Sequence, residues 1–174
     1  MKPFINATLF QIVWVACVLG GSNVALIVTS VYLFLHDHYF MNKRSEWRLV
    51  LLFFFLGVLI DGSYFHLGIF SLSADAQYFG NFPPIWLLCL WGAVATLFAH
   101  SLAFLRTRYY LSAMLGFIGP TGSYIAGAKL AGITLAEPTL FSVFAIALVW
   151  SLILPAGVYC CEKWALYTKE DKPL

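Results

Sequence analysis

The sequence predicts an all-α integral membrane protein, folded as one compact bundle of six transmembrane helices over residues 1–174. Of the 174 residues, 61% are apolar and only 10% are charged, and the mean hydropathy is +0.85. A soluble domain of this length would carry about 25% charged residues. These values exclude a disordered chain and a soluble globular domain, and they leave the membrane as the solvent.

The apolar blocks can be assigned to helices in order, because a helix needs about 20 apolar residues to cross the bilayer core. The first block, residues 4–35, is long enough for one tilted helix or for two short ones. The run Gly20-Gly21-Ser22-Asn23 favours a break, since glycine is a poor helix former. We therefore expect single-domain spans at approximately 4–19, 23–38, 48–70, 84–105, 109–130 and 139–160.

The distribution of positive charge predicts the topology of these spans. With six spans, nine of the ten Lys and Arg residues lie on one side of the membrane, and only Lys129 lies on the other. The nine are Lys2, Lys43, Arg44, Arg48, Arg106, Arg108, Lys163, Lys169 and Lys172. Cytoplasmic loops carry an excess of Lys and Arg, so both termini are expected in the cytoplasm. We attribute the net charge of +2 to these loop residues rather than to a binding surface for an anionic partner. We therefore expect no nucleic-acid partner.

Asp61 is the first candidate functional residue, because a charged group in the hydrocarbon core costs about 2.5 kcal/mol or more. Gly57, Asp61, Tyr64 and Gly68 follow helical spacing, so the carboxylate shares a face with small residues and is expected to point into the bundle. It is either a structural hydrogen-bond acceptor or a catalytic group that transfers protons, binds an ion or contacts substrate.

His100 is the second candidate catalytic residue. Gly92, Thr96 and His100 recur every four residues, and Ser101 follows directly. A histidine can relay protons near neutral pH, but an imidazole bonded to a neighbouring backbone or serine group is equally ordinary.

A polar cluster of substrate-binding residues is expected around His100. Asn6 and Gln11 enter at a similar depth from the first helix, so that Asn6, Gln11, His100 and Ser101 can meet. The alternative is that these side chains only form hydrogen bonds between helices.

Pro120 lies within the fifth predicted span and removes a helical hydrogen bond, which predicts a kinked or broken helix. The hydroxyl groups of Thr121, Ser123 and Tyr124 then lie about 20 Å from the inner edge, near the depth of Asp61. We interpret these three as substrate-binding residues. The same helix carries a stripe of small residues that predicts close packing, and we expect packing on one side and a polar pocket on the other. The stripe is Ser112, Gly116, Gly119, Ser123 and Gly127.

The segment His36-Asp37-His38 resembles a metal chelate. Neighbouring side chains on a helix point apart, however, so no metal site is predicted there. The sequence identifies no cofactor.

Motifs spread along nearly the whole chain resemble those of one bacterial family, the integral membrane family catalogued as domain of unknown function 2878. They are Asn6 with Phe10-Gln11 and Trp14, residues 16–20, Asp61, residues 84–86, residues 98–102 and residues 119–124. The resemblance implies a small protein of the bacterial inner membrane, and it brings no catalytic residue or cofactor. It also implies an association with lipid-modifying enzymes, including enzymes similar to cyclopropane fatty acid synthases.

Three functions remain open. In the first, the protein modifies membrane lipids or fatty acids, as an enzyme or an accessory subunit, with Asp61 and His100 as acid or base. In the second, it is a small proton-coupled carrier in which Asp61 titrates. In the third, it is a structural scaffold. The expected partners are membrane lipids, lipid-modifying enzymes and a second copy of the chain.

Overall fold

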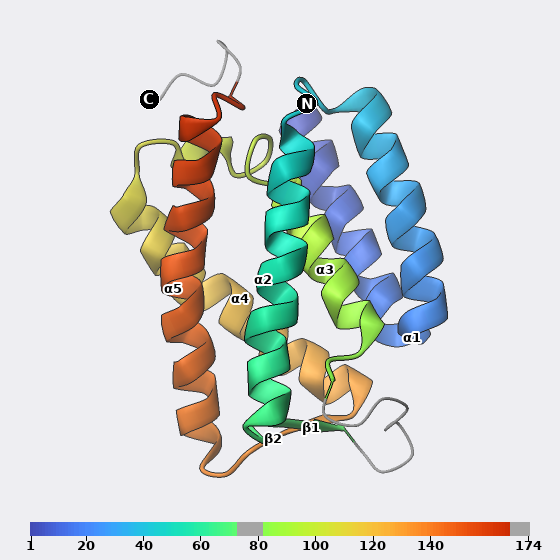
Figure 1. Ribbon diagram of the computed structural model, residues 1–174, viewed down its shortest axis with the longest axis vertical. Coiled ribbons are helices and arrows are strands. Elements are labelled where there is room, and N and C mark those ends of the chain that lie inside the picture. Colours follow the sequence, from blue (N-terminus) through green and yellow to red (C-terminus); the bar gives the residue numbers. More distant parts are fainter. Residues whose placement is uncertain (73–81, 168–174) are drawn as a thin grey trace.

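A computed structural model describes residues 1–72 and 82–167, which fold into a helical bundle (Figure 1). Within these residues there are five α-helices: α1 (Lys2–Tyr39), α2 (Glu46–His66), α3 (Ile85–Ala95), α4 (Tyr109–Ala131) and α5 (Thr139–Lys163). Lys169 and Lys172, which entered the topology prediction, lie outside the described residues. The chain is therefore a mainly helical protein of the membrane type.

The first two predicted helices form a single element, α1, so the described residues hold five α-helices rather than the predicted six. The element is nevertheless broken at Gly21, whose backbone dihedrals are φ 69° and ψ −172°. Only glycine adopts such a conformation without steric cost, because it has no Cβ atom. The glycine pair that predicted a break thus marks the place where the helical path is interrupted.

The chain reverses direction at this break, and the two arms of α1 lie side by side (Figure 1). Asn6 Nδ2 lies 3.4 Å from the hydroxyl of Tyr32, although 26 residues separate them. Cys17 Sγ lies 3.6 Å from Thr29 Oγ1 in the same way. A straight helix would hold the first pair about 39 Å apart. Residues 2–20 and 22–39 are therefore two antiparallel arms.

A short antiparallel strand pair joins the bundle at the end remote from the start of α1 and the end of α5 (Figure 1). Helix α2 ends at His66 rather than continuing to residue 70, and Gly68 follows with a positive φ of 70°. Strand β1 (Phe70–Leu72) then pairs with β2 (Ile133–Leu135), with Ser71 opposite Thr134. The sequence did not predict this short strand pair, because three residues are too few for an alternating pattern to show.

Helix α3 ends at Ala95, whereas the sequence predicted a helix over 84–105. Beyond Ala95 the backbone continues in tighter turns, with the N–H groups of Thr96, Leu97 and Phe98 bonded to carbonyls three residues earlier. The 3₁₀ helix η2 (Ala103–Leu105) completes this stretch. Apolar composition alone does not distinguish these turns from an α-helix, which is why the prediction overran.

Helix α4 runs continuously from Tyr109 to Ala131 with Pro120 inside it, so the predicted break is wrong, and a kink stays a prediction. Helices α4 and α5 pack closely at Gly116, where an added Cβ atom would lie 2.3 Å from the Trp150 carbonyl oxygen. The small-residue stripe therefore serves packing at this position.

Three helices of the described part, α1, α2 and α5, are long and apolar enough to cross a membrane, and α3 is a shorter apolar helix. Large apolar side chains such as Ile27, Leu59 and Leu152 are about two-thirds exposed on the outside. The interior is filled by aromatic groups, including Phe53 and Phe98 with ring centroids 4.8 Å apart. An outer surface of this kind suits contact with lipid chains.

Candidate functional site

The first candidate site is the Asp61 cluster, formed by Asp61, Trp91 and Tyr124. Asp61 on α2 is fully buried. Its Oδ2 accepts a 2.7 Å hydrogen bond from Trp91 Nε1 on α3, and its Oδ1 accepts a 2.8 Å bond from the Tyr124 hydroxyl on α4. The carboxylate predicted to face the interior therefore joins three helices.

Close packing fixes the position of Trp91 in this cluster. A Cβ atom on Gly57 would lie 2.4 Å from Trp91 Cγ, so only glycine lets the indole lie against α2 one helical turn before Asp61. The other side of the indole stacks on Trp150 of α5, with centroids 4.8 Å apart and planes inclined by 25°. The indole N–H is thereby aimed at the carboxylate.

An apolar pocket of about 480 Å³ lies beside the Asp61 cluster, between the first arm of α1, α3, α4 and α5. Phe10, Trp14, Trp86 and Leu154 are among its lining residues, and Trp91 and Tyr124 form the part of the wall that contacts Asp61. Ligand pockets are commonly apolar cavities of this size with a few placed polar groups.

Only some of the residues predicted to bind substrate line this pocket. Gln11, Ser123 and Tyr124 line it, as does Gly119. Thr121 is buried elsewhere and bonds to the Phe117 carbonyl of its own helix at 2.6 Å. Of the small-residue stripe on α4, Gly116 packs against α5, whereas Gly119, Ser123 and Gly127 line the pocket, so the predicted separation of packing and pocket onto two sides of the helix is not observed.

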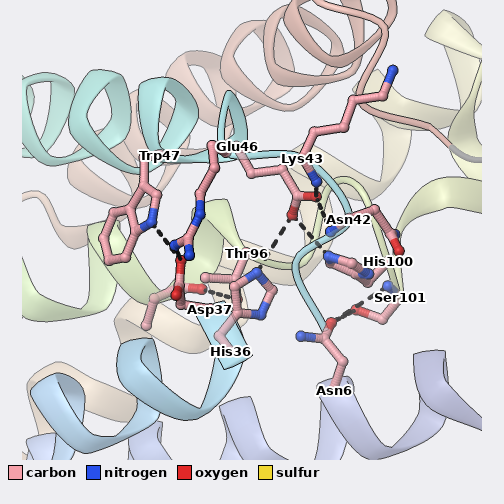
Figure 2. Close-up of polar contacts among 12 residues, drawn as sticks. Asn6, His36, Asp37, Asn42, Lys43, Glu46, Trp47, Thr96, His100 and Ser101 are labelled. Carbon is pink, nitrogen blue, oxygen red and sulfur yellow. Dashed lines mark hydrogen bonds and ion pairs between the residues drawn. The ribbon is translucent and has the colours of Figure 1, made fainter. Parts of the chain in front are cut away.

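The second candidate site is the His–Glu cluster, formed by His36 of α1, Glu46 of α2 and His100 of the turns after α3. Figure 2 shows the Glu46 carboxylate between the two imidazoles. Glu46 Oε2 lies 2.9 Å from His100 Nε2 and 3.5 Å from His36 Nε2, and the imidazole centroids are 4.9 Å apart. All three side chains are buried.

The turn between α1 and α2 orients Glu46. Its Oε1 accepts hydrogen bonds from the backbone N–H groups of Asn42 at 2.9 Å and Lys43 at 3.3 Å. Asp37, on another face of α1, pairs with Arg44 and accepts a 2.8 Å bond from Trp47 Nε1 (Figure 2). The turn is thus held from two sides.

His36 is the least satisfied member of this cluster. Its side chain is 1% exposed, and neither ring nitrogen has a hydrogen-bond partner. The ring stacks on Phe40 with centroids 5.9 Å apart. A buried polar group without a partner costs about 1–3 kcal/mol, so this arrangement requires an explanation.

The predicted polar cluster around His100 forms only in part. Asn6 Oδ1 accepts a 2.9 Å bond from the Ser101 hydroxyl, so these two residues meet as expected (Figure 2). His100 bonds to Glu46 instead, and Gln11 lies at the apolar pocket. Asp61 and His100 belong to separate clusters, so they do not form one catalytic dyad.

Sequence reasoning missed His36 and Glu46. The interpretation that neighbouring residues of His36-Asp37-His38 point apart agrees with the structure, since His36 is buried and His38 is exposed. Ala25, Thr29, Tyr32 and His36 follow helical spacing and are all buried, and this pattern was the available signal for a buried histidine. It could not show that Glu46 and His100 would join from other elements.

The comparisons with known proteins identify a family and nothing closer. No curated protein and no solved structure matches the chain. Residues 3–156 match the family model described as protein of unknown function (DUF2878), and the chain belongs to this family.

Proposed function

We propose that this member of the DUF2878 family crosses the membrane six times, binds the apolar chain of a membrane lipid in its pocket, and acts in lipid or fatty-acid modification as an enzyme or an accessory subunit. The observation that carries the proposal is the apolar pocket whose wall holds a buried carboxylate through Trp91 and Tyr124.

The reversal of α1 at Gly21 supports six crossings. Each arm holds 18 or 19 residues, which corresponds to about 28 Å of helix and matches a bilayer core of about 30 Å. The start of α1 and the end of α5 then lie on one side, since both lie at the same end of the bundle in Figure 1. Lys2, Lys43, Arg106 and Lys163 occur at the helix boundaries on that side, and Lys129 near the opposite end of α4. Positive charge favours the cytoplasm for the side of the termini.

The shape of the pocket supports a lipid chain as its occupant. Its lining reaches from Leu102, in the turns after α3, to Phe70 and Ile133 in the strand pair at the other end. The pocket therefore extends along much of the bundle. Burial of apolar surface is the main driving force for binding in such a pocket. A long hydrocarbon chain can bury apolar surface along the whole length of the pocket.

The opening of the pocket supports entry from the membrane. Gln11 and Gly119 line the pocket and are both exposed at the surface. Each lies about 14–15 Å from the start of its helix, which places both near mid-depth of the bundle. At that depth the neighbouring medium is hydrocarbon, so an acyl chain can enter sideways.

Asp61 supplies the chemistry in this proposal. A polar group of the lipid that reaches the wall near Tyr124 can compete for one of the two hydrogen bonds that the carboxylate accepts. The carboxylate then acts as a general base or as an orienting group. In the accessory-subunit form of the proposal, the same contacts hold the lipid for a partner enzyme.

The test is whole-cell lipid mass spectrometry on a deletion strain complemented with wild type, Asp61→Asn or the control Asp37→Asn, at equal membrane levels. Asp37 is also a helix carboxylate, but it pairs with Arg44 away from the pocket. We expect the deletion and Asp61→Asn to alter the same lipids and Asp37→Asn to restore them. Unchanged lipids in the expressed deletion strain would overturn the proposal.

A second candidate function is a proton-coupled carrier, which the fully buried carboxylate of Asp61 beside a pocket favours. It predicts unchanged lipids together with a substrate flux that depends on the proton gradient and is lost in Asp61→Asn.

A further inference from the structure

The His–Glu cluster gathers three metal-binding side chains at one point, away from the pocket. One ligand atom each from His36, Glu46 and His100 lies within 4.8 Å of the other two. The residues come from α1, the first turn of α2, and the turns after α3. The fold thus brings together a donor set of two imidazoles and one carboxylate, which is a common set for zinc and other divalent transition metals.

The spacing of the donor atoms fits a metal ion. Ligand atoms about 2.0–2.1 Å from a tetrahedral zinc ion are about 3.3 Å from one another. The observed separations from Glu46 Oε2, 2.9 Å to His100 Nε2 and 3.5 Å to His36 Nε2, lie on either side of this value. The nitrogens of the two imidazoles lie within 4.8 Å of each other, so the rings would move toward each other to bind one ion.

His36 provides an independent observation that points to a ligand. Its ring is 1% exposed, and Nε2 faces the carboxylate without forming a hydrogen bond. Stacking on Phe40 fixes the plane of the ring. A buried nitrogen that lies 3.5 Å from a carboxylate oxygen, in ion-pair range but without a hydrogen bond, has the position of a metal ligand.

Glu46 is held as a metal-bound carboxylate would be. Its Oε1 is occupied by the N–H groups of Asn42 and Lys43, which leaves Oε2 directed at the two imidazoles (Figure 2). Such supporting bonds orient ligands and are typical of metal sites.

We propose that His36, Glu46 and His100 form a site for a divalent transition-metal ion of the zinc class, with a fourth position open to water or substrate. The ion compensates the charge of the buried carboxylate and binds His36, whose ring nitrogens form no hydrogen bond. This site is independent of lipid binding in the apolar pocket.

The test uses the full chain purified in detergent, stripped with a chelator and titrated with Co²⁺, whose visible absorption reports imidazole and carboxylate ligation. We expect one Co²⁺ per chain, displaced by Zn²⁺. His36→Phe keeps the stacking on Phe40 but cannot ligate, and Glu46→Gln keeps the shape of the carboxylate. Each is expected to bind Co²⁺ at least about tenfold more weakly.

The matched control is His38→Phe, on the same helix but exposed, which should bind as the wild type does. In parallel, Zn²⁺ should raise the unfolding temperature of the stripped wild-type protein, a measurement that needs no variant. A stripped wild-type protein that gives neither a Co²⁺ spectrum nor a thermal shift would overturn the proposal. A Co²⁺ titration of folded His36→Phe that equals the wild type would also overturn it.

Discussion

The hydroxyl of Tyr124 on α4 donates a 2.8 Å hydrogen bond to the carboxylate of Asp61 on α2, 63 residues away in the chain. This bond links the wall of the apolar pocket to a buried carboxylate. It also makes the helix with the internal proline part of the polar site. The occupant of the pocket and the state of Asp61 are therefore expected to influence each other.

Removing this bond should weaken the bundle. In Tyr124→Phe the carboxylate keeps only its bond from Trp91, and the free energy of unfolding should fall by about 1–3 kcal/mol. The measurement is the unfolding transition of the purified protein in detergent. Tyr110→Phe is the control, because Tyr110 lies on the same helix and is 92% exposed. An equal loss of unfolding free energy in Tyr124→Phe and Tyr110→Phe would contradict a specific stabilising contribution from the bond between Tyr124 and Asp61.

Gly57 should be intolerant of even one methyl group. In Gly57→Ala the new Cβ would lie 2.4 Å from Trp91 Cγ, so the indole must move away and its bond to Asp61 is lost. Overpacking of this kind costs about 1–3 kcal/mol. We expect a lower unfolding temperature and a changed tryptophan fluorescence spectrum.

The control for this substitution is Gly62→Ala on the same helix, where the nearest atom to the new Cβ is 4.0 Å away. It should leave both the unfolding temperature and the fluorescence spectrum unchanged. A Gly57→Ala protein with wild-type fluorescence and stability would contradict the packing described for Trp91.

The proposed topology predicts opposite locations for the C-terminus and for the end of α4. Green fluorescent protein fused after residue 174 should fluoresce in the cytoplasm. Alkaline phosphatase fused after Gly132, which follows α4, should be active outside it. The opposite pattern, or two reporters on the same side, would contradict six crossings with both termini cytoplasmic.

Local backbone chemistry made parts of the fold predictable from the sequence. The break at Gly21 follows from two adjacent glycines within an overlong apolar block, and the structure shows the positive φ that only glycine adopts freely. Asp61 was predicted to face the interior because it shares helical spacing with Gly57. It is fully buried beside α3, whose Trp91 packs directly against Gly57. Both inferences need only residues near in sequence.

Long-range contacts explain what the sequence did not show. The Thr96 side chain bonds to the Ala93 carbonyl and lies 2.6 Å from the Tyr32 hydroxyl, where the backbone leaves the α-helical path. Tyr32 is 64 residues away, so no local pattern reveals this contact. Glu46 is a second example. In the sequence it is only a charged residue near the start of a helix, and its contacts with His36 and His100 form only in the folded protein.

The most direct test of the account is to identify the lipids that stay bound to the purified protein, by mass spectrometry of wild type, Gly119→Leu and Gly122→Leu. Both glycines lie on α4 with open space at the Cβ position, but Gly119 lines the pocket and Gly122 is not among its lining residues. A leucine side chain at position 119 is expected to occupy part of the pocket. Wild type and Gly122→Leu are expected to retain the same lipid, and Gly119→Leu is expected to lose most of it. Equal retention by all three proteins would contradict a lipid chain in this pocket.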